Sequence, residues 1–101
     1  MTSAFDVLAE PNRRRILDFL RRGELAAGDL GYLLAISQPG VSKHLRILRE
    51  AGLVTVRGDG QRRLYSLRPE PLAAVDAWLA PYRRLWSTSL DRLEAHLDAE
   101  Q

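Results

Sequence analysis

The chain has 101 residues, of which 46% are hydrophobic, and this is the size and composition of one folded domain over residues 1–101. No apolar run approaches the roughly 18 residues that cross a membrane, and the N-terminus lacks a basic region followed by a long apolar one. We therefore expect a cytoplasmic protein with no membrane partner. The chain contains no cysteine, which excludes disulfides and thiolate metal ligands.

The net charge of +2 is unevenly distributed along the chain. Residues 11–68 hold 12 Arg and Lys against 5 Asp and Glu, a net charge of +7, whereas the remainder holds 3 against 8, a net charge of −5. This asymmetry favours a polyanion as the partner of the central part of the chain.

Two short helices are predicted at the start of the chain. Phe5 and Leu8 lie in a first helix over residues 2–9, behind a Thr or Ser cap. Pro11 fits the first turn of a second helix, where its missing N–H costs nothing, and Gly23 ends that helix. Its core stripe comprises Ile16, Leu17, Phe19 and Leu20. We expect three solvent-facing arginines, which serve solubility or contact phosphate: Arg13, Arg14 and Arg15.

Residues 25–51 predict a helix-turn-helix. The leucines of residues 25–35 follow a helical pattern that Gly28 and Gly31 weaken by about 1 kcal/mol each relative to Ala. A tight link leads to a second helix, which Ser37 caps and Gly52 ends. Its buried stripe comprises Val41, Leu45 and Leu48.

The outer face of this second helix carries Gln38, Ser42, Lys43 and Arg46. An amide, a hydroxyl and two cations suit a helix that reads base edges and holds phosphates in a major groove. A solvated surface face is the alternative interpretation. The candidate DNA contacts of this segment are Ser37, Gln38, Pro39, Gly40, Ser42, Lys43, His44 and Arg46.

Residues 53–67 predict a β-hairpin, because LVTVR and RRLYSL both alternate in polarity around the turn-forming Gly58, Asp59 and Gly60. A hairpin directly after a recognition helix is a wing. We expect Arg57, Arg62 and Arg63 to cluster near its tip and to contact phosphates or the minor groove. Alternatively, these charges protect a solvated strand edge against aggregation.

Residues 71–98 predict a long last helix whose apolar row exceeds what this small domain can cover. Pro81 lies inside the helix, where a kink or a break is expected. A second copy of the chain is the simplest cover for the row, so we expect residues 1–10 and 71–98 to dimerise. The alternative is a helix folded back on its own core. The predicted interface residues are Phe5, Leu8, Leu72, Val75, Trp78, Leu79, Tyr82, Leu85, Trp86, Leu90, Leu93 and Leu97.

Together these elements predict a mainly α fold with a small β-hairpin, an α+β winged helix-turn-helix in the order α-α-α-α-β-β-α. Three stretches of the chain also resemble the ArsR/SmtB family of bacterial winged-helix repressors. They are FDVLAEPNRRRILDFLRRGELAAGDL, ISQPGVSKHLRILREAGLVTVR and GQRRLYSL. The resemblance implies a homodimer that represses its own promoter by binding a palindromic operator and releases it when an effector arrives. It further implies that Gln38, Ser42 and Lys43 enter the groove and that Arg46 holds the backbone.

The chain departs from this family at its metal sites. Ala26 and Gly28 stand where metal-sensing members carry thiolates in a motif resembling ELCVCDL. A second family site also looks absent, because Asp76 is followed by Trp78 where a His would stand. His96 and Glu100 alone are a weak metal signal. We therefore predict no metal and no cofactor, and the sequence names no effector.

The sequence thus predicts a dimeric DNA-binding repressor that is not a metal sensor of this kind. The alternative is a winged-helix module that binds a protein and little or no nucleic acid, which the charge of residues 11–68 disfavours. An enzyme is not expected, since the chain has no cysteine, two distant histidines and no glycine loop for phosphates.

Overall fold

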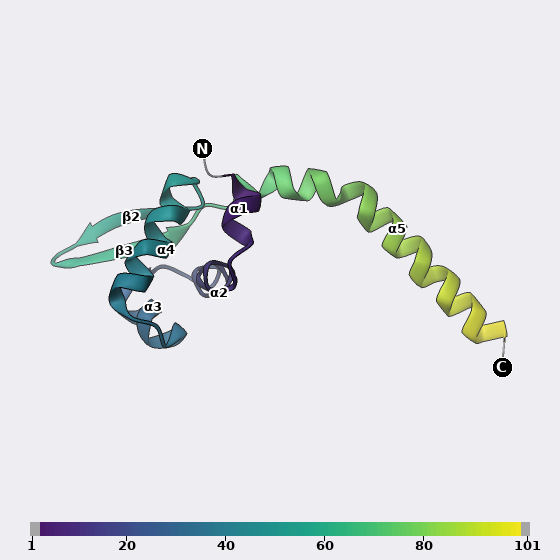
Figure 1. Ribbon diagram of the computed structural model, residues 1–101, viewed down its shortest axis with the longest axis horizontal. Coiled ribbons are helices and arrows are strands. Elements are labelled where there is room, and N and C mark those ends of the chain that lie inside the picture. The colour runs from purple at the N-terminus through teal and green to yellow at the C-terminus, as the bar shows by residue number, and fades with distance from the viewer. Residues whose placement is uncertain (1–2, 100–101) are drawn as a thin grey trace.

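The computed structural model describes residues 3–99 as a small helical domain with a three-stranded sheet and one long projecting helix (Figure 1). The predicted class, mainly α with a winged helix-turn-helix, is confirmed. The proposed Thr2 cap and the Glu100 side chain lie outside the described residues. The elements are α1 (Ala4–Leu8), α2 (Pro11–Leu20), β1 (Leu25–Ala26), α3 (Ala27–Leu34), α4 (Gln38–Glu50), β2 (Val54–Asp59), β3 (Arg62–Leu67) and α5 (Leu72–Ala99).

The first two helices begin where the sequence predicts. Ser3 caps α1, because its Oγ accepts a hydrogen bond from the Asp6 N–H at 3.3 Å while the Asp6 carboxylate accepts from the Ser3 N–H. Pro11 is the first residue of α2. This helix ends at Leu20 rather than at Gly23, which follows two turn residues and has a φ of 147°.

Arg14 and Arg15 are exposed, as predicted, and Arg13 is half-buried. Arg13 and Arg14 also hold α1 against α2. The Arg13 Nε donates to the carbonyl oxygen of Val7 at 2.9 Å, and an Arg14 guanidinium N–H donates to that of Leu8 at 2.6 Å. The last carbonyls of a helix have no partner within it, and cations are favourable at that end. The two arginines therefore fix the C-terminus of α1.

The predicted third helix begins two residues late, because Leu25 and Ala26 form a strand. They pair antiparallel with Tyr65 and Leu64, so the sheet has the order β1-β3-β2 and the predicted hairpin gains a third strand. The Ala26 N–H donates to the Asp29 carboxylate at 3.4 Å. This hydrogen bond lies at the start of α3, which Ala26 directly precedes. Pairing with the free edge of β3 outweighs the helical pattern of these two residues.

A single core joins α1, α2, α3 and α4 to the base of the sheet. The predicted buried stripe of α4, formed by Val41, Leu45 and Leu48, is confirmed. Full burial of each of these side chains stabilises the packing of the helix by about 1.5–3 kcal/mol. The buried core comprises Val7, Ile16, Leu17, Leu20, Leu30, Leu34, Val41, Leu45, Leu48, Leu53 and Val54.

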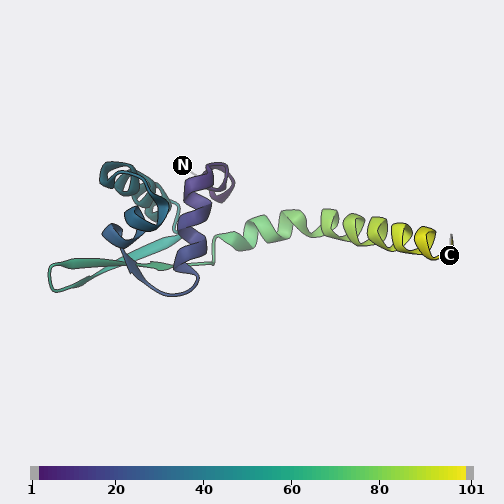
Figure 2. The same cartoon turned by 90° about the horizontal axis from the view of Figure 1, so that it is seen from below.

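The last helix, α5, leaves this core and projects from the domain (Figures 1 and 2), so that the molecule measures 63 × 29 × 20 Å. The helix is continuous through Pro81, so the proline does not break it, although α5 bends along its length in Figure 1. None of its residues is buried. The alternative prediction, a helix folded back on its own core, is therefore wrong.

Candidate nucleic-acid interface

The turn between α3 and α4 fixes the angle of the helix-turn-helix. Ala35 ends α3 with a left-handed φ of 57°, which costs a residue with a Cβ about 1–2 kcal/mol. Ser37 caps α4 by accepting a hydrogen bond from the Gly40 N–H at 3.3 Å. Both predicted ends of α4 are confirmed, since Gly52 follows it with a φ of 76°.

Most of the predicted DNA contacts lie on the solvent side of α4. Ser37, Pro39, Ser42, Lys43 and Arg46 are exposed, and Gly40 is half-buried. Within residues 3–99 the side chains of Ser42, Lys43 and Arg46 make no hydrogen bond or ion pair. This face is therefore available to a ligand.

Gln38 is exposed as well, but its side-chain amide lies against Gly31 of α3. A Cβ on Gly31 would overlap the Gln38 Nε2 and would lie 3.4 Å from the Val41 Cγ2. Gly31 is buried, so the missing side chain leaves a seat for the Gln38 amide at the junction of the two helices. The sequence indicated only that Gly31 weakens α3.

His44 faces the body of the domain. Its side chain is 15% exposed, and its Nε2 lies 3.7 Å from a carboxylate oxygen of Glu10, the residue that caps α2. Its Nδ1 is buried and makes no hydrogen bond to any described residue. The structure thus sets His44 apart from the outward side chains of α4.

The wing turns at Gly60 and Gln61, because Asp59 and Arg62 form the last pair of the hairpin and Gly60 has a φ of 64°. Gly58, which the sequence placed in the turn, belongs to β2 and pairs with Arg63.

Two of the three predicted wing arginines bind carboxylates of the domain. The Arg57 Nε lies 3.0 Å from the Glu24 Oε2, and a second N–H of the same guanidinium donates to Oε1. These hydrogen bonds lower the pKa of Glu24 and raise the pKa of Arg57. Arg62 lies 3.3 Å from Asp29, whereas Arg63 makes no ion pair within residues 3–99.

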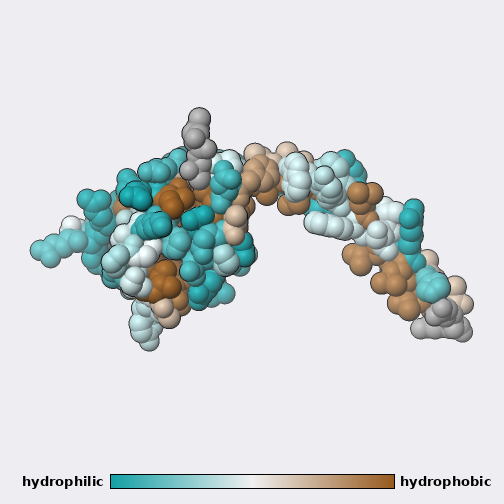
Figure 3. Space-filling view, in the orientation of Figure 1, coloured by the Kyte–Doolittle hydropathy of each residue, from teal (hydrophilic) through white to brown (hydrophobic). Residues whose placement is uncertain are grey.

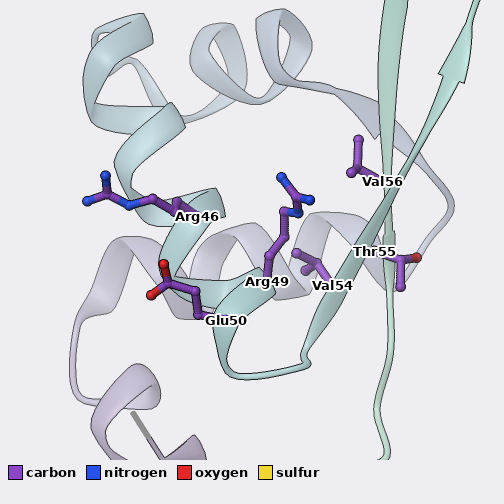
Figure 4. Close-up of a pocket in the computed structure, with 6 residues that line it drawn as sticks. All are labelled: Arg46, Arg49, Glu50, Val54, Thr55 and Val56. Atoms are coloured by element: carbon purple, nitrogen blue, oxygen red, sulfur yellow. The ribbon is translucent and has the colours of Figure 1, made fainter. Parts of the chain in front are cut away.

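A groove of about 540 Å³ lies between α4 and β2 (Figure 4). Arg49, which was not among the predicted contacts, rises between the helix and the strand in this view, whereas Arg46 points away from the strand. Its position could have been found from the sequence, because Ser42, Arg46 and Arg49 follow steps of four and three on one helix face. The groove is lined by Arg46, Arg49, Glu50, Val54, Thr55 and Val56.

Neither a metal cluster nor a membrane span appears in the described part of the chain. No three or more His, Cys, Asp or Glu residues within 3–99 come together as metal ligands. No helix in the same range is long and apolar enough to cross a membrane.

Two helices joined by a tight turn and followed by a hairpin wing define a winged helix-turn-helix protein. A family model described as a helix-turn-helix domain matches residues 8–57. The chain is 40% identical over 97 residues to the HTH-type transcriptional regulator Rv2034 of Mycobacterium tuberculosis, covering 96% of this chain and 88% of that protein. It is 37% identical over 79 residues to the transcriptional repressor SdpR of Bacillus subtilis, covering 78% and 88%.

Solved structures agree with these relatives. A crystal structure of an ArsR family transcriptional regulator, RHA00566, matches with a TM-score of 0.70 and 34% identity, covering 82% of this chain and 86% of that one. The chain therefore belongs to the ArsR/SmtB family of helix-turn-helix transcriptional regulators, and the predicted resemblance is confirmed. Members of this family are DNA-binding regulators, not enzymes.

Proposed function

We propose that this protein is a transcriptional repressor that binds, as a homodimer, a palindromic operator in its own promoter. The observation that carries the proposal is the exposed, unpaired polar face of α4, which lies between α3 and the wing. The net charge of +7 over residues 11–68 supports a polyanionic ligand. Such a protein acts in the cytoplasm on double-stranded DNA.

In this proposal α4 is the recognition helix. Ser42 and Lys43 enter the major groove, and Gln38 leaves its seat on Gly31 to reach a base edge. The first turn of α4, from Ser37 to Gly40, lies next to a phosphate and offers it the Gln38 N–H, since Pro39 has no N–H and the Gly40 N–H donates to the Ser37 Oγ. Arg46 holds the backbone, and the wing contacts phosphates beside the groove.

The homodimer is supported by the apolar surface of α5, visible as brown patches along the projecting helix in Figure 3. Exposed rows of this kind mark interaction sites, and a second copy would bury both rows at once. Phe5 of α1 packs edge-on against Trp78 with ring centroids 5.9 Å apart, so α1 would join the interface. The exposed large apolar residues of α5 are Trp78, Tyr82, Leu85, Trp86, Leu90, Leu93 and Leu97.

We further propose that repression does not depend on a thiolate metal site. Ala26 ends β1 and Gly28 lies in α3, and neither residue carries a metal-ligating side chain. The effector, if the protein has one, would act elsewhere.

Selection of bound fragments from genomic DNA tests the proposal, because the recovered site gives its symmetry and half-site spacing, expected at about one helical turn. On that operator, Gln38→Ala should cost about 1–3 kcal/mol, with little effect on a scrambled duplex. Gln61→Ala, in the wing turn, is the matched control and should leave the ratio of the two affinities unchanged. An equal loss on both duplexes would remove the base-reading role of Gln38. A complete absence of binding at modest salt would favour the protein-interaction module.

A further inference from the structure

We propose that the two faces of the wing have different tasks in DNA binding. The face toward α4 holds backbone phosphates through Arg63, together with Arg46 and Arg49 of the helix. The opposite face fixes the angle of the wing through Arg57 and Arg62, which do not contact DNA. This inference rests on the proposed DNA binding and assigns the phosphate contacts within it.

The strand register separates the arginines. Cross-strand partners share a face of a hairpin, and residues two apart along a strand share it as well. Val54 and Val56 line the groove beside α4, and in Figure 4 they lie on the side of the strand that faces Arg49. Gly58 belongs to that face, and its partner is Arg63. Arg63 therefore lies on the wing face that borders α4.

The other face is held by carboxylates of the domain. Arg57 pairs across the hairpin with Leu64, two residues from Arg62, so both arginines lie on the face that Arg63 does not occupy. Both oxygens of Glu24 accept from Arg57, and the Ser66 hydroxyl donates to one of them at 3.3 Å.

Asp29 provides the second point of attachment by binding Arg62. Glu24 and Asp29 lie on either side of β1, next to the edge on which β1 pairs with β3. A phosphate at either arginine would compete with its carboxylate for the guanidinium N–H groups that the carboxylate already binds. Their geometry suits a brace for the wing.

The groove beside α4 offers the opposite situation. Arg46 and Arg49 of the groove, and Arg63 on the wing face that borders α4, make no ion pair within residues 3–99, so their guanidinium groups need no prior release. Arg46 and Arg49 continue the exposed stripe of Ser42 toward the base of the wing. Glu50 is the acidic residue of the groove lining, and the two arginines outnumber it. The ligand that fits is a phosphodiester, which a guanidinium binds bidentately.

Salt dependence of binding tests the groove, because each phosphate contact contributes about one unit to the slope of log affinity against log salt. Arg49→Gln and Arg63→Gln should each lower the slope by about 1 per bound protomer on a duplex recovered by selection and on a scrambled one. Arg92→Gln, on α5 and far from the wing, is the matched control and should leave the slope unchanged. An unchanged slope for Arg49→Gln would overturn the groove assignment.

Glu24→Gln tests the brace, because the two interpretations of Arg57 predict opposite signs. If Arg57 positions the wing, losing the carboxylate weakens DNA binding several-fold, and the effect disappears in an Arg63→Gln background. If Arg57 contacts phosphate, removing its competing acid tightens binding, and that result would overturn the proposal. Circular dichroism verifies that each variant remains folded. Failure of the unmodified protein to bind any duplex would instead refute the proposed function itself.

Discussion

Leu90→Ala should weaken the proposed dimer without affecting the folded domain. Leu90 is 64% exposed on the apolar row of α5. Full burial of a leucine is worth about 1.5–3 kcal/mol, so covering the exposed two thirds is worth about 1–2 kcal/mol. Both protomers of a homodimer carry the substitution, so the dimer loses about 2–4 kcal/mol of binding free energy. This loss raises the dimer dissociation constant by about 30- to 1,000-fold.

Sedimentation equilibrium over nanomolar to micromolar concentrations measures this shift. Leu33→Ala is the matched control, since Leu33 is also exposed, at 41%, but lies on α3 rather than on α5. It should leave the dissociation constant unchanged. A monomeric unmodified protein at micromolar concentration, or an equal shift in both variants, would refute α5 as the interface.

Two further predictions concern the junction of α3 with α4 and the wing. Gly31→Ala should raise the free energy of unfolding by up to about 1 kcal/mol, because alanine favours a helix and the displaced group is the flexible end of Gln38. The displaced Gln38 amide would then point outward, so the variant should also bind the operator more tightly. A variant that is less stable and binds the operator more weakly would contradict the contact between Gln38 and Gly31. Arg57 lowers the pKa of Glu24, so this carboxylate stabilises the fold above its ordinary pKa of 4.5 and loses that contribution as the pH falls below it. Thermal unfolding against pH should show the stability difference between the unmodified protein and Glu24→Gln shrinking in acid, and a difference that grew there would exclude the ion pair.

The helix α4 was predictable because its signals are local. Ser37, Gly52 and a buried stripe at steps of three and four all lie within residues 37–52. By contrast, β1 has only two residues, which cannot show an alternating pattern, and it exists because β3 offers a free edge. The helical spacing of the leucines therefore led to a wrong prediction, a helix instead of a strand, for Leu25 and Ala26. Of the two outcomes predicted at Pro81, a kink or a break, the break does not occur, since α5 is continuous through the proline.

The wing shows why the candidate site was only partly predictable. Arg57, Arg62 and Arg63 are close in sequence and were predicted as one cluster, although adjacent strand residues point to opposite faces. The partners that divide them, Glu24 and Asp29, each precede their arginine by 33 residues. Contacts of that separation depend on the packing of β1 against β3, which composition does not reveal. The contact between Gln38 and Gly31 depends instead on the angle between the consecutive helices α3 and α4.

The distance between the two recognition helices of the proposed dimer depends on α1. Arg13 and Arg14 hold α1 on α2, which shares the buried core with α4. At the other end Phe5 packs against Trp78, near the point where α5 leaves the domain. A continuous series of contacts thus sets the direction of α5 relative to α4. Because α5 would carry the twofold contact, we expect α1 to determine which half-site spacing the dimer accepts, although it reads no base.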